Sequence, residues 1–145
     1  MDFLKYIKYF IVFTLAFNFC ILLFVYILNF PVLITGNKIL VNEYYFKNIH
    51  HSILFDTILV AIYLIIAKII IKLLNINNIF YKSIVVFITT IVISGIAYIY
   101  FIFRPITKNF YSRWFHSVGL KGILYYIIII IFIYLLYEYT IYKIK

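Results

Sequence analysis

The chain has 145 residues, of which 68% are hydrophobic and 12% charged, and its mean hydropathy is +1.14. A soluble domain of this size could not bury so much apolar surface, and long stretches lack the charged face of a soluble helix, so a soluble globule is excluded. The formal net charge of +9 comes from cations in loops and at the ends of apolar runs, a pattern that excludes a nucleic-acid reader and favours anionic lipid headgroups as partners.

The first long apolar run covers residues 9–30 and ends before Pro31. A helix rises 1.5 Å per residue, so about 20 residues cross the hydrocarbon layer, and this run predicts a first transmembrane helix. The run is longer than the apolar stretch of a signal peptide, and no A-x-A-like cleavage site follows it. We therefore expect a retained span.

A polar connector, residues 31–51, follows the first span. Its neighbouring aromatic residues Tyr44 and Tyr45 are of the kind that lie at the headgroup level, so both are predicted to be interfacial anchors. The second predicted span covers residues 52–74. Asp56 lies four residues into it.

A short asparagine-rich turn leads to the third predicted span, residues 83–103. Because the turn is so short, the second and third spans should be antiparallel neighbours. Small residues in the middle of the third span let helix backbones approach closely and predict a helix-packing face. This face consists of Thr90, Ser94, Gly95 and Ala97.

The second connector, residues 104–119, holds both arginines and the only tryptophan of the chain. Phe110 and Trp114 are four residues apart and Arg113 lies between them, which predicts a short amphipathic segment along the membrane surface. These three residues complete the predicted interfacial anchors. The fourth predicted span covers residues 120–137.

Four spans predict an all-α membrane protein, residues 1–145 forming one domain with both termini on one side. The halves also resemble each other, since a shift of 74 places Pro31 on Pro105 and a shift of 67 places Tyr44 on Tyr111. Two parallel helical-hairpin repeats with interfacial connectors would explain these matches. Chance matching in a sequence rich in isoleucine, phenylalanine and tyrosine is the alternative.

Asp56 is the sharpest functional candidate, because its carboxylate is predicted to lie about 6 Å inside the second span, where a lone charge is costly. Arg104, at the end of the third span, falls on the same side of the membrane. We expect a structural intramembrane ion pair between them, or a helix-start carboxylate favoured by the helix dipole, ahead of a transport role.

No pattern of catalytic or cofactor-binding residues occurs in the sequence. The three histidines fall at the predicted mouths of the spans and no HExxH or CxxC is present, so we expect neither metal nor haem. A glycine-rich phosphate loop, paired carboxylates and a potassium-type filter are also missing, so an enzyme is not expected.

These features favour a non-catalytic, multi-pass integral membrane subunit of a larger complex, with a structural or assembly role and other membrane subunits as partners. An energy-converting complex or a virion membrane would suit it. A small transporter or channel that uses Asp56 is the alternative. The heavy use of Ile, Tyr, Phe, Asn and Lys indicates an AT-rich source, so the mitochondrial inner membrane and a viral or cellular membrane are the leading locations.

Overall fold

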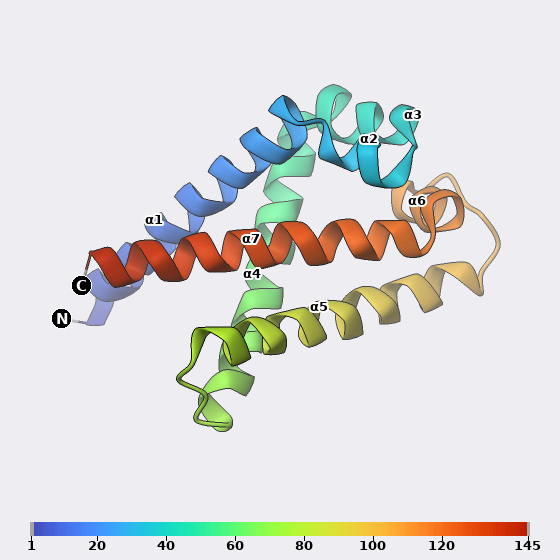
Figure 1. The fold of residues 1–145 in the computed structure, drawn as a ribbon. Helices are drawn as coiled ribbons and strands as arrows, with labels where there is room; N and C mark the ends of the chain where they lie inside the picture. The colour runs from blue at the N-terminus through green and yellow to red at the C-terminus, as the bar shows by residue number, and fades with distance from the viewer. Residues whose placement is uncertain (1, 145) are drawn as a thin grey trace.

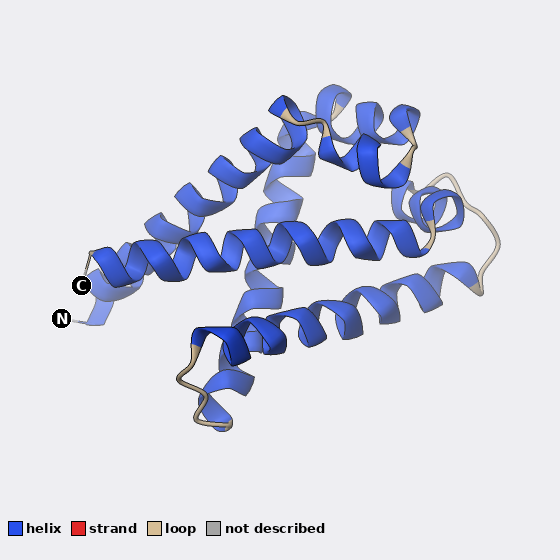
Figure 2. Cartoon of the chain, in the orientation of Figure 1, coloured by secondary structure: helices blue, strands red, loops and turns tan. Residues whose placement is uncertain are grey.

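The computed structural model describes the backbone of residues 2–144 and the side chains of residues 3–144. This part of the chain is almost entirely helical and contains no strand (Figure 2). Four of its helical segments are long and apolar enough to cross a membrane, so the expected all-α membrane class is confirmed. These segments are Phe3–Ile27, Ile49–Leu73, Ile79–Ile102 and Leu120–Lys143.

The four long helices match the four predicted spans, with different ends. The first span is formed by α1 (Asp2–Ile21) and the π-helical turn η1 (Leu22–Ile27), and the others are α4 (Ile49–Leu73), α5 (Ile79–Ile102) and α7 (Leu120–Lys143). The first helix begins earlier than predicted and the last one ends later. Both extensions carry lysines, since a helix can continue into the headgroup region after its apolar run has ended.

Both connectors contain short helices, whose bounds are α2 (Phe30–Thr35), α3 (Lys38–Asn42), the π-helical η2 (Glu43–Lys47) and α6 (Phe110–Val118). Asn29, with φ of 50°, separates the first span from α2, and Gly36, with φ of 71°, ends α2 in the left-handed conformation. The side chains of Asn37 and Asn109 accept hydrogen bonds from backbone N–H groups at the starts of α3 and α6. Local capping residues therefore set where these helices begin and end.

The central helix of the fold is α7, which packs against both α1 and α5 (Figure 1). The remaining long helix, α4, packs against α5, and its backbone does not approach that of α1 as closely. The core follows this arrangement, because Ile130, Ile133 and Tyr134 of α7 are at most 1% exposed. The helices therefore form an open bundle, with α1 and α4 apart.

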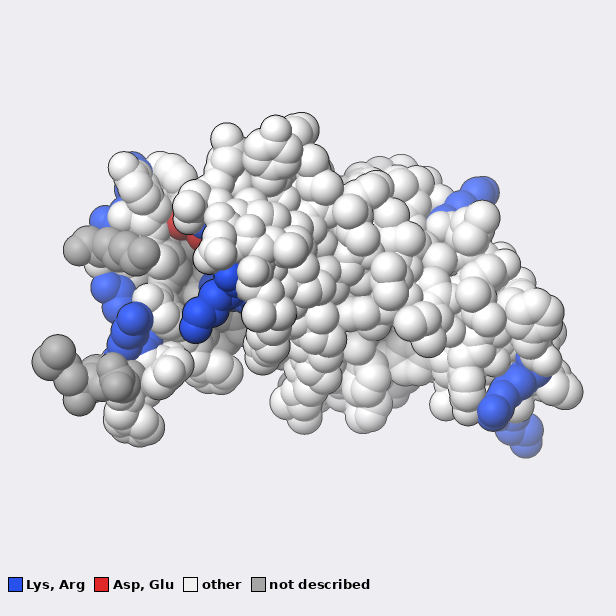
Figure 3. All heavy atoms as spheres, turned by 90° about the horizontal axis from the view of Figure 1, so that it is seen from below, with Lys and Arg blue, Asp and Glu red and all other residues white. Residues whose placement is uncertain are grey.

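The two ends of the described chain lie side by side, and both connectors lie at the other end of the bundle (Figure 1). The Lys8 ammonium group donates a hydrogen bond to the carbonyl oxygen of Ile144 over 2.6 Å. The predicted placement of both termini on one side is confirmed. On the face shown in Figure 3, lysine and arginine side chains gather at the two ends and the middle carries none, as a bilayer requires.

The element order repeats as long helix, connector and long helix, which agrees with the predicted relation between the halves. If the two halves are equivalent, α1 corresponds to α5 and α4 corresponds to α7. The pair α1–α7 then corresponds to the pair α5–α4, and both pairs are in contact. Tyr44 and Tyr111, which match at the shift of 67, meet with their hydroxyl oxygens 2.8 Å apart. The first connector has additional helices, however, and the duplication stays a prediction.

Candidate functional site

The two connectors pack against each other through polar contacts and form one layer over their end of the bundle. Arg113 of α6 and Glu43 of η2 form a bidentate ion pair, in which the distance from Nη1 to Oε2 is 2.8 Å. This pair places a guanidinium fork on a carboxylate, the strongest common geometry for an ion pair. The side-chain amide of Asn37 donates to the hydroxyl of Ser117 over 3.1 Å. Contacts between residues 70 and 80 positions apart therefore hold the layer together.

Tyr44 is the residue at which both connectors and α4 meet. Its hydroxyl donates to Oδ1 of Asp56 over 2.6 Å and lies 2.8 Å from the hydroxyl oxygen of Tyr111. Its ring stacks on Phe110, with 4.5 Å between ring centroids. Its backbone carbonyl accepts a hydrogen bond from the hydroxyl of Ser52. The hydroxyl of Tyr44 is thus bonded to α4 and α6, and its backbone carbonyl is bonded to α4.

The neighbouring Tyr45 extends this network towards α7. Its hydroxyl lies 2.9 Å from that of Tyr125, and its backbone carbonyl accepts a hydrogen bond from Tyr26 over 2.7 Å. Burial raises the pKa of Tyr44, and the negative charge of Asp56 raises it further. Burial is also the main cause that raises the pKa of Tyr45 and of Tyr111. These connector hydroxyls therefore stay protonated at neutral pH and can donate hydrogen bonds to a carboxylate.

A hollow of about 320 Å³ opens beside this network, and its lining includes Tyr44, Tyr111, His51 and Asn109. The hydroxyl of Tyr44 connects this hollow directly to the carboxylate of Asp56. An ionisable residue inside a membrane span often marks a proton relay or the path of a polar ligand. Asp56, Tyr44 and Tyr111 form the candidate site.

Metal-ligating side chains do not come together in this layer. Among the described side chains, those of residues 3–144, no three of histidine, cysteine, aspartate or glutamate are close enough to hold a metal ion. His50 and His51 are both exposed. The chemistry of the candidate site therefore rests on one carboxylate and the surrounding hydroxyl groups.

The predicted ion pair between Asp56 and Arg104 is wrong. Asp56 faces η2 and accepts its hydrogen bond from Tyr44, whereas the guanidinium of Arg104 lies 4.0 Å from the ring centroid of Tyr100. The two ion pairs among the described residues are Arg113 with Glu43 and Lys68 with Glu138. The predicted pair rested on the depth of the two residues in the membrane. Depth does not determine the direction in which Asp56 points around the axis of α4.

The predicted interfacial anchors lie in the connector layer, but three of them do not face lipid. Tyr44, Tyr45 and Trp114 are only 8%, 4% and 2% exposed, which contradicts the anchor role. Phe110 and Arg113 are partly exposed. Large amphipathic rings can also be buried where their polar groups find partners, as the hydroxyl groups of Tyr44 and Tyr45 do here.

The predicted helix-packing face is placed only in part against another helix. Thr90 and Ser94 are fully buried, and the hydroxyl of Ser94 lies 3.1 Å from that of Tyr63 on α4. Ala97 is partly exposed. A Cβ atom added at Gly95 would meet nothing within 4 Å, so this glycine does not mark a close approach inside the chain.

The glycine that does mark a close approach, Gly122, was missed by sequence reasoning. A Cβ atom there would lie 2.8 Å from Nε1 of Trp114, so α6 rests directly on the first turn of α7. A glycine inside an otherwise bulky helix is a local signal for such an approach. The pairing of Glu43 was also missed, although the chain has only four acidic residues to neutralise its cations.

No protein-family model, no curated protein and no solved structure matches this chain.

Proposed function

We propose that this chain is a non-catalytic, multi-pass subunit of a larger membrane complex, and that the outer face of α1 binds another transmembrane helix. The observation that carries the proposal is the position of Asn18. It is the one asparagine within the four spans, and its side chain is exposed on the outside of the bundle. A neutral amide at this depth needs polar partners that lipid tails do not offer.

The residues around Asn18 form a continuous exposed face along α1 and the first residue of η1. Ile11, Leu15 and Leu22 are 51%, 64% and 55% exposed, and together with Asn18 they follow the alternating spacing of four and three that coiled-coil seams use. A single polar residue within such a seam specifies the register of the partner helix. The pattern supports pairing with a helix rather than contact with lipid alone.

The hydrogen bonds of Asn18 support the same conclusion. Its amide nitrogen donates to the carbonyl oxygen of Thr14 over 2.8 Å, within α1 itself. The amide oxygen and the second N–H have no partner among the described residues, whereas an asparagine side chain can form about four hydrogen bonds. A partner helix that bonds to these groups would contribute about 1–2 kcal/mol, as polar contacts between helices do in membranes.

Replacing Asn18 by leucine tests the proposal, with Asn18→Gln as a variant that keeps the amide. The size of the complex would be measured after extraction in a mild detergent. We expect Asn18→Leu to release the chain from its complex and Asn18→Gln to retain most of it. Ile88→Leu, on the exposed face of α5, is the matched control. Migration of the unmodified chain as a lone monomer would contradict the proposal.

A second candidate function, transport of protons or small cations, is favoured by the contact between Asp56 and Tyr44 beside the connector hollow. Asp56→Asn separates the two candidates, because it removes the charge and keeps the shape. Proton flux into liposomes and the size of the complex would be measured on the same preparation. Loss of flux with intact assembly would favour transport, and loss of assembly alone would favour the structural subunit.

A further inference from the structure

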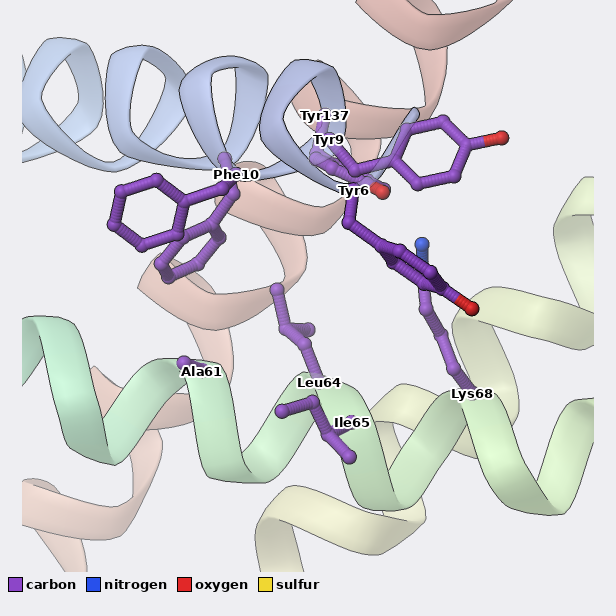
Figure 4. A pocket seen from close by; sticks show the side chains of 9 residues that line it. Tyr6, Tyr9, Phe10, Ala61, Leu64, Ile65, Lys68 and Tyr137 are labelled. Atoms are coloured by element: carbon purple, nitrogen blue, oxygen red, sulfur yellow. The ribbon is translucent and has the colours of Figure 1, made fainter. Parts of the chain in front are cut away.

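The gap between α1 and α4 is a groove of about 280 Å³ with an almost wholly apolar lining (Figure 4). Rings from α1, including Tyr6 and Phe10, form one wall, and Ala61 and Ile65 of α4 form the other. Lys68 of α4 is the one charged residue that lines it, and its ammonium group lies over the ring of Tyr137, which also lines the groove. The groove is therefore apolar along its length and cationic at the end near the chain termini.

A second hollow, of about 340 Å³, adjoins the groove at Lys68. Its lining includes Lys72 of α4 and Lys82 of α5, Asn75 and Asn77 of the turn between these helices, and the carboxylate of Glu138 of α7. Lys68 and Lys72 are four residues apart and so lie on one face of α4. Three lysines and one glutamate thus line a partly polar hollow that adjoins an apolar groove.

The charges at this junction are only partly neutralised. The ammonium group of Lys68 lies 3.5 Å from Oε1 of Glu138 and 3.9 Å from the ring centroid of Tyr137. Lys72 and Lys82 have no ion-pair partner among the described residues. The positive charges of Lys72 and Lys82 therefore remain without a counter-ion beside the groove. They lie at the end of the bundle that also holds the lysines near the two chain ends.

We propose that this junction binds one anionic phospholipid, with its phosphate on Lys72 and Lys82 and an acyl chain in the groove between α1 and α4. The amide groups of Asn75 and Asn77 can donate to the remaining phosphate oxygens. Lysine side chains at the end of a span reach the headgroup level, which is the depth of a lipid phosphate.

The chemistry of the junction favours a phospholipid over other occupants. A partner helix would fill the apolar groove, but its backbone and apolar side chains would leave the lysines without a counter-ion. A free phosphate would neutralise the lysines and leave the groove uncovered. An amphiphile with an anionic head satisfies both halves, and α1 and α4 leave room for it where α5 and α7 pack directly.

The test uses the full chain purified in detergent, with native mass spectrometry to count bound phosphatidylglycerol and, separately, phosphatidylcholine. We expect retention of phosphatidylglycerol alone. Lys72→Ala with Lys82→Ala should weaken this retention roughly 30-fold, since each lysine near an anionic surface contributes about fivefold. The matched control is Lys38→Ala with Lys108→Ala, which removes the same charge from exposed positions at the connector end. Ala61→Phe fills the groove and leaves every lysine in place, and it should also release the lipid.

The outcomes separate the two halves of the site. Equal retention of both lipids, or equal losses in the Lys72/Lys82 and Lys38/Lys108 variants, would overturn the headgroup assignment. Displacement of the lipid by millimolar inorganic phosphate, or unchanged retention in a folded Ala61→Phe chain, would overturn the acyl-chain assignment. Circular dichroism establishes that each variant is helical, and the lysine variant tests the proposal even if Ala61→Phe does not fold.

Discussion

The hydroxyl of Tyr44 lies 2.6 Å from Oδ1 of Asp56, so a residue of the first connector supplies the hydrogen bond to a carboxylate within the second span. The same hydroxyl contacts Tyr111 of the second connector. A carboxylate in a span needs a partner because desolvation of a lone charge is costly. The hydrogen bond therefore holds the connector layer against α4.

Replacing Tyr44 by phenylalanine should destabilise the protein by about 1–3 kcal/mol, because it leaves Asp56 without its hydrogen-bond donor. Thermal unfolding in detergent, followed by circular dichroism, would measure the effect. Tyr142→Phe is the matched control, since Tyr142 is 81% exposed and should tolerate the change. Equal unfolding temperatures for the two variants would show that the contact with Asp56 contributes nothing.

Introducing a methyl group at Gly122 should destabilise the packing of α6 on α7 by about 1–3 kcal/mol, because the new Cβ would lie only 2.8 Å from Trp114 Nε1. Trp114 is the only tryptophan, so its fluorescence emission should report the shift directly. Gly95→Ala is the control and should be neutral or stabilising by up to about 1 kcal/mol, since the site is open and helical. The reverse order of stabilities would refute the close approach.

The stability of the fold should fall at acid pH, because protonation of Glu43 breaks its ion pair with Arg113. The hydrogen bonds from Arg113 lower the pKa of Glu43 below its ordinary value of 4.5. A carboxyl group whose folded pKa is depressed stabilises the fold above its unfolded pKa and loses that contribution as pH falls through the folded pKa.

Unfolding temperatures of the unmodified chain and of Glu43→Gln would be compared from about pH 7 to about pH 3. The unmodified chain should be the more stable at neutral pH, and the difference should shrink below about pH 4.5. High salt should also reduce it, because the pair is partly exposed. A difference that is independent of pH would mean that the pair does not control acid stability.

Enlarging Ser94 to leucine should separate α4 from α5, because Ser94 is fully buried and its hydroxyl meets that of Tyr63. We expect a loss of about 1–3 kcal/mol from overpacking, and a loss of about 0.6 kcal/mol for Ser94→Ala, which removes only the hydrogen bond. Ser83→Leu, at a partly exposed position near the start of α5, is the matched control. Thermal unfolding measures all three, and equal effects of the two leucine variants would rule out a packing role for Ser94.

Much of the architecture follows from local features of the sequence. The apolar runs predict the four spans, and Asn109 and Gly119 bound α6 as a cap and a stop, because span length and helix ends depend on neighbouring residues. An even number of spans also places both termini on one side. The burial of Thr90 and Ser94 agrees with the small-residue pattern of the third span.

The candidate site depended on features that are not local. The sequence placed Asp56 near the connector end of its span, but the partner of its carboxylate depends on the rotation of α4 about its axis, which packing sets. Arg104 was predicted to lie at a depth similar to that of Asp56, but the carboxylate of Asp56 points towards Tyr44. Likewise, the sequence identified Tyr44, Tyr45 and Trp114 as connector aromatics, and only the tertiary structure decided that they face each other instead of lipid. The length of each span depends on consecutive apolar residues and can be read along the chain. The direction in which a side chain points, and the partner that it bonds to, depend on contacts between residues far apart in the sequence.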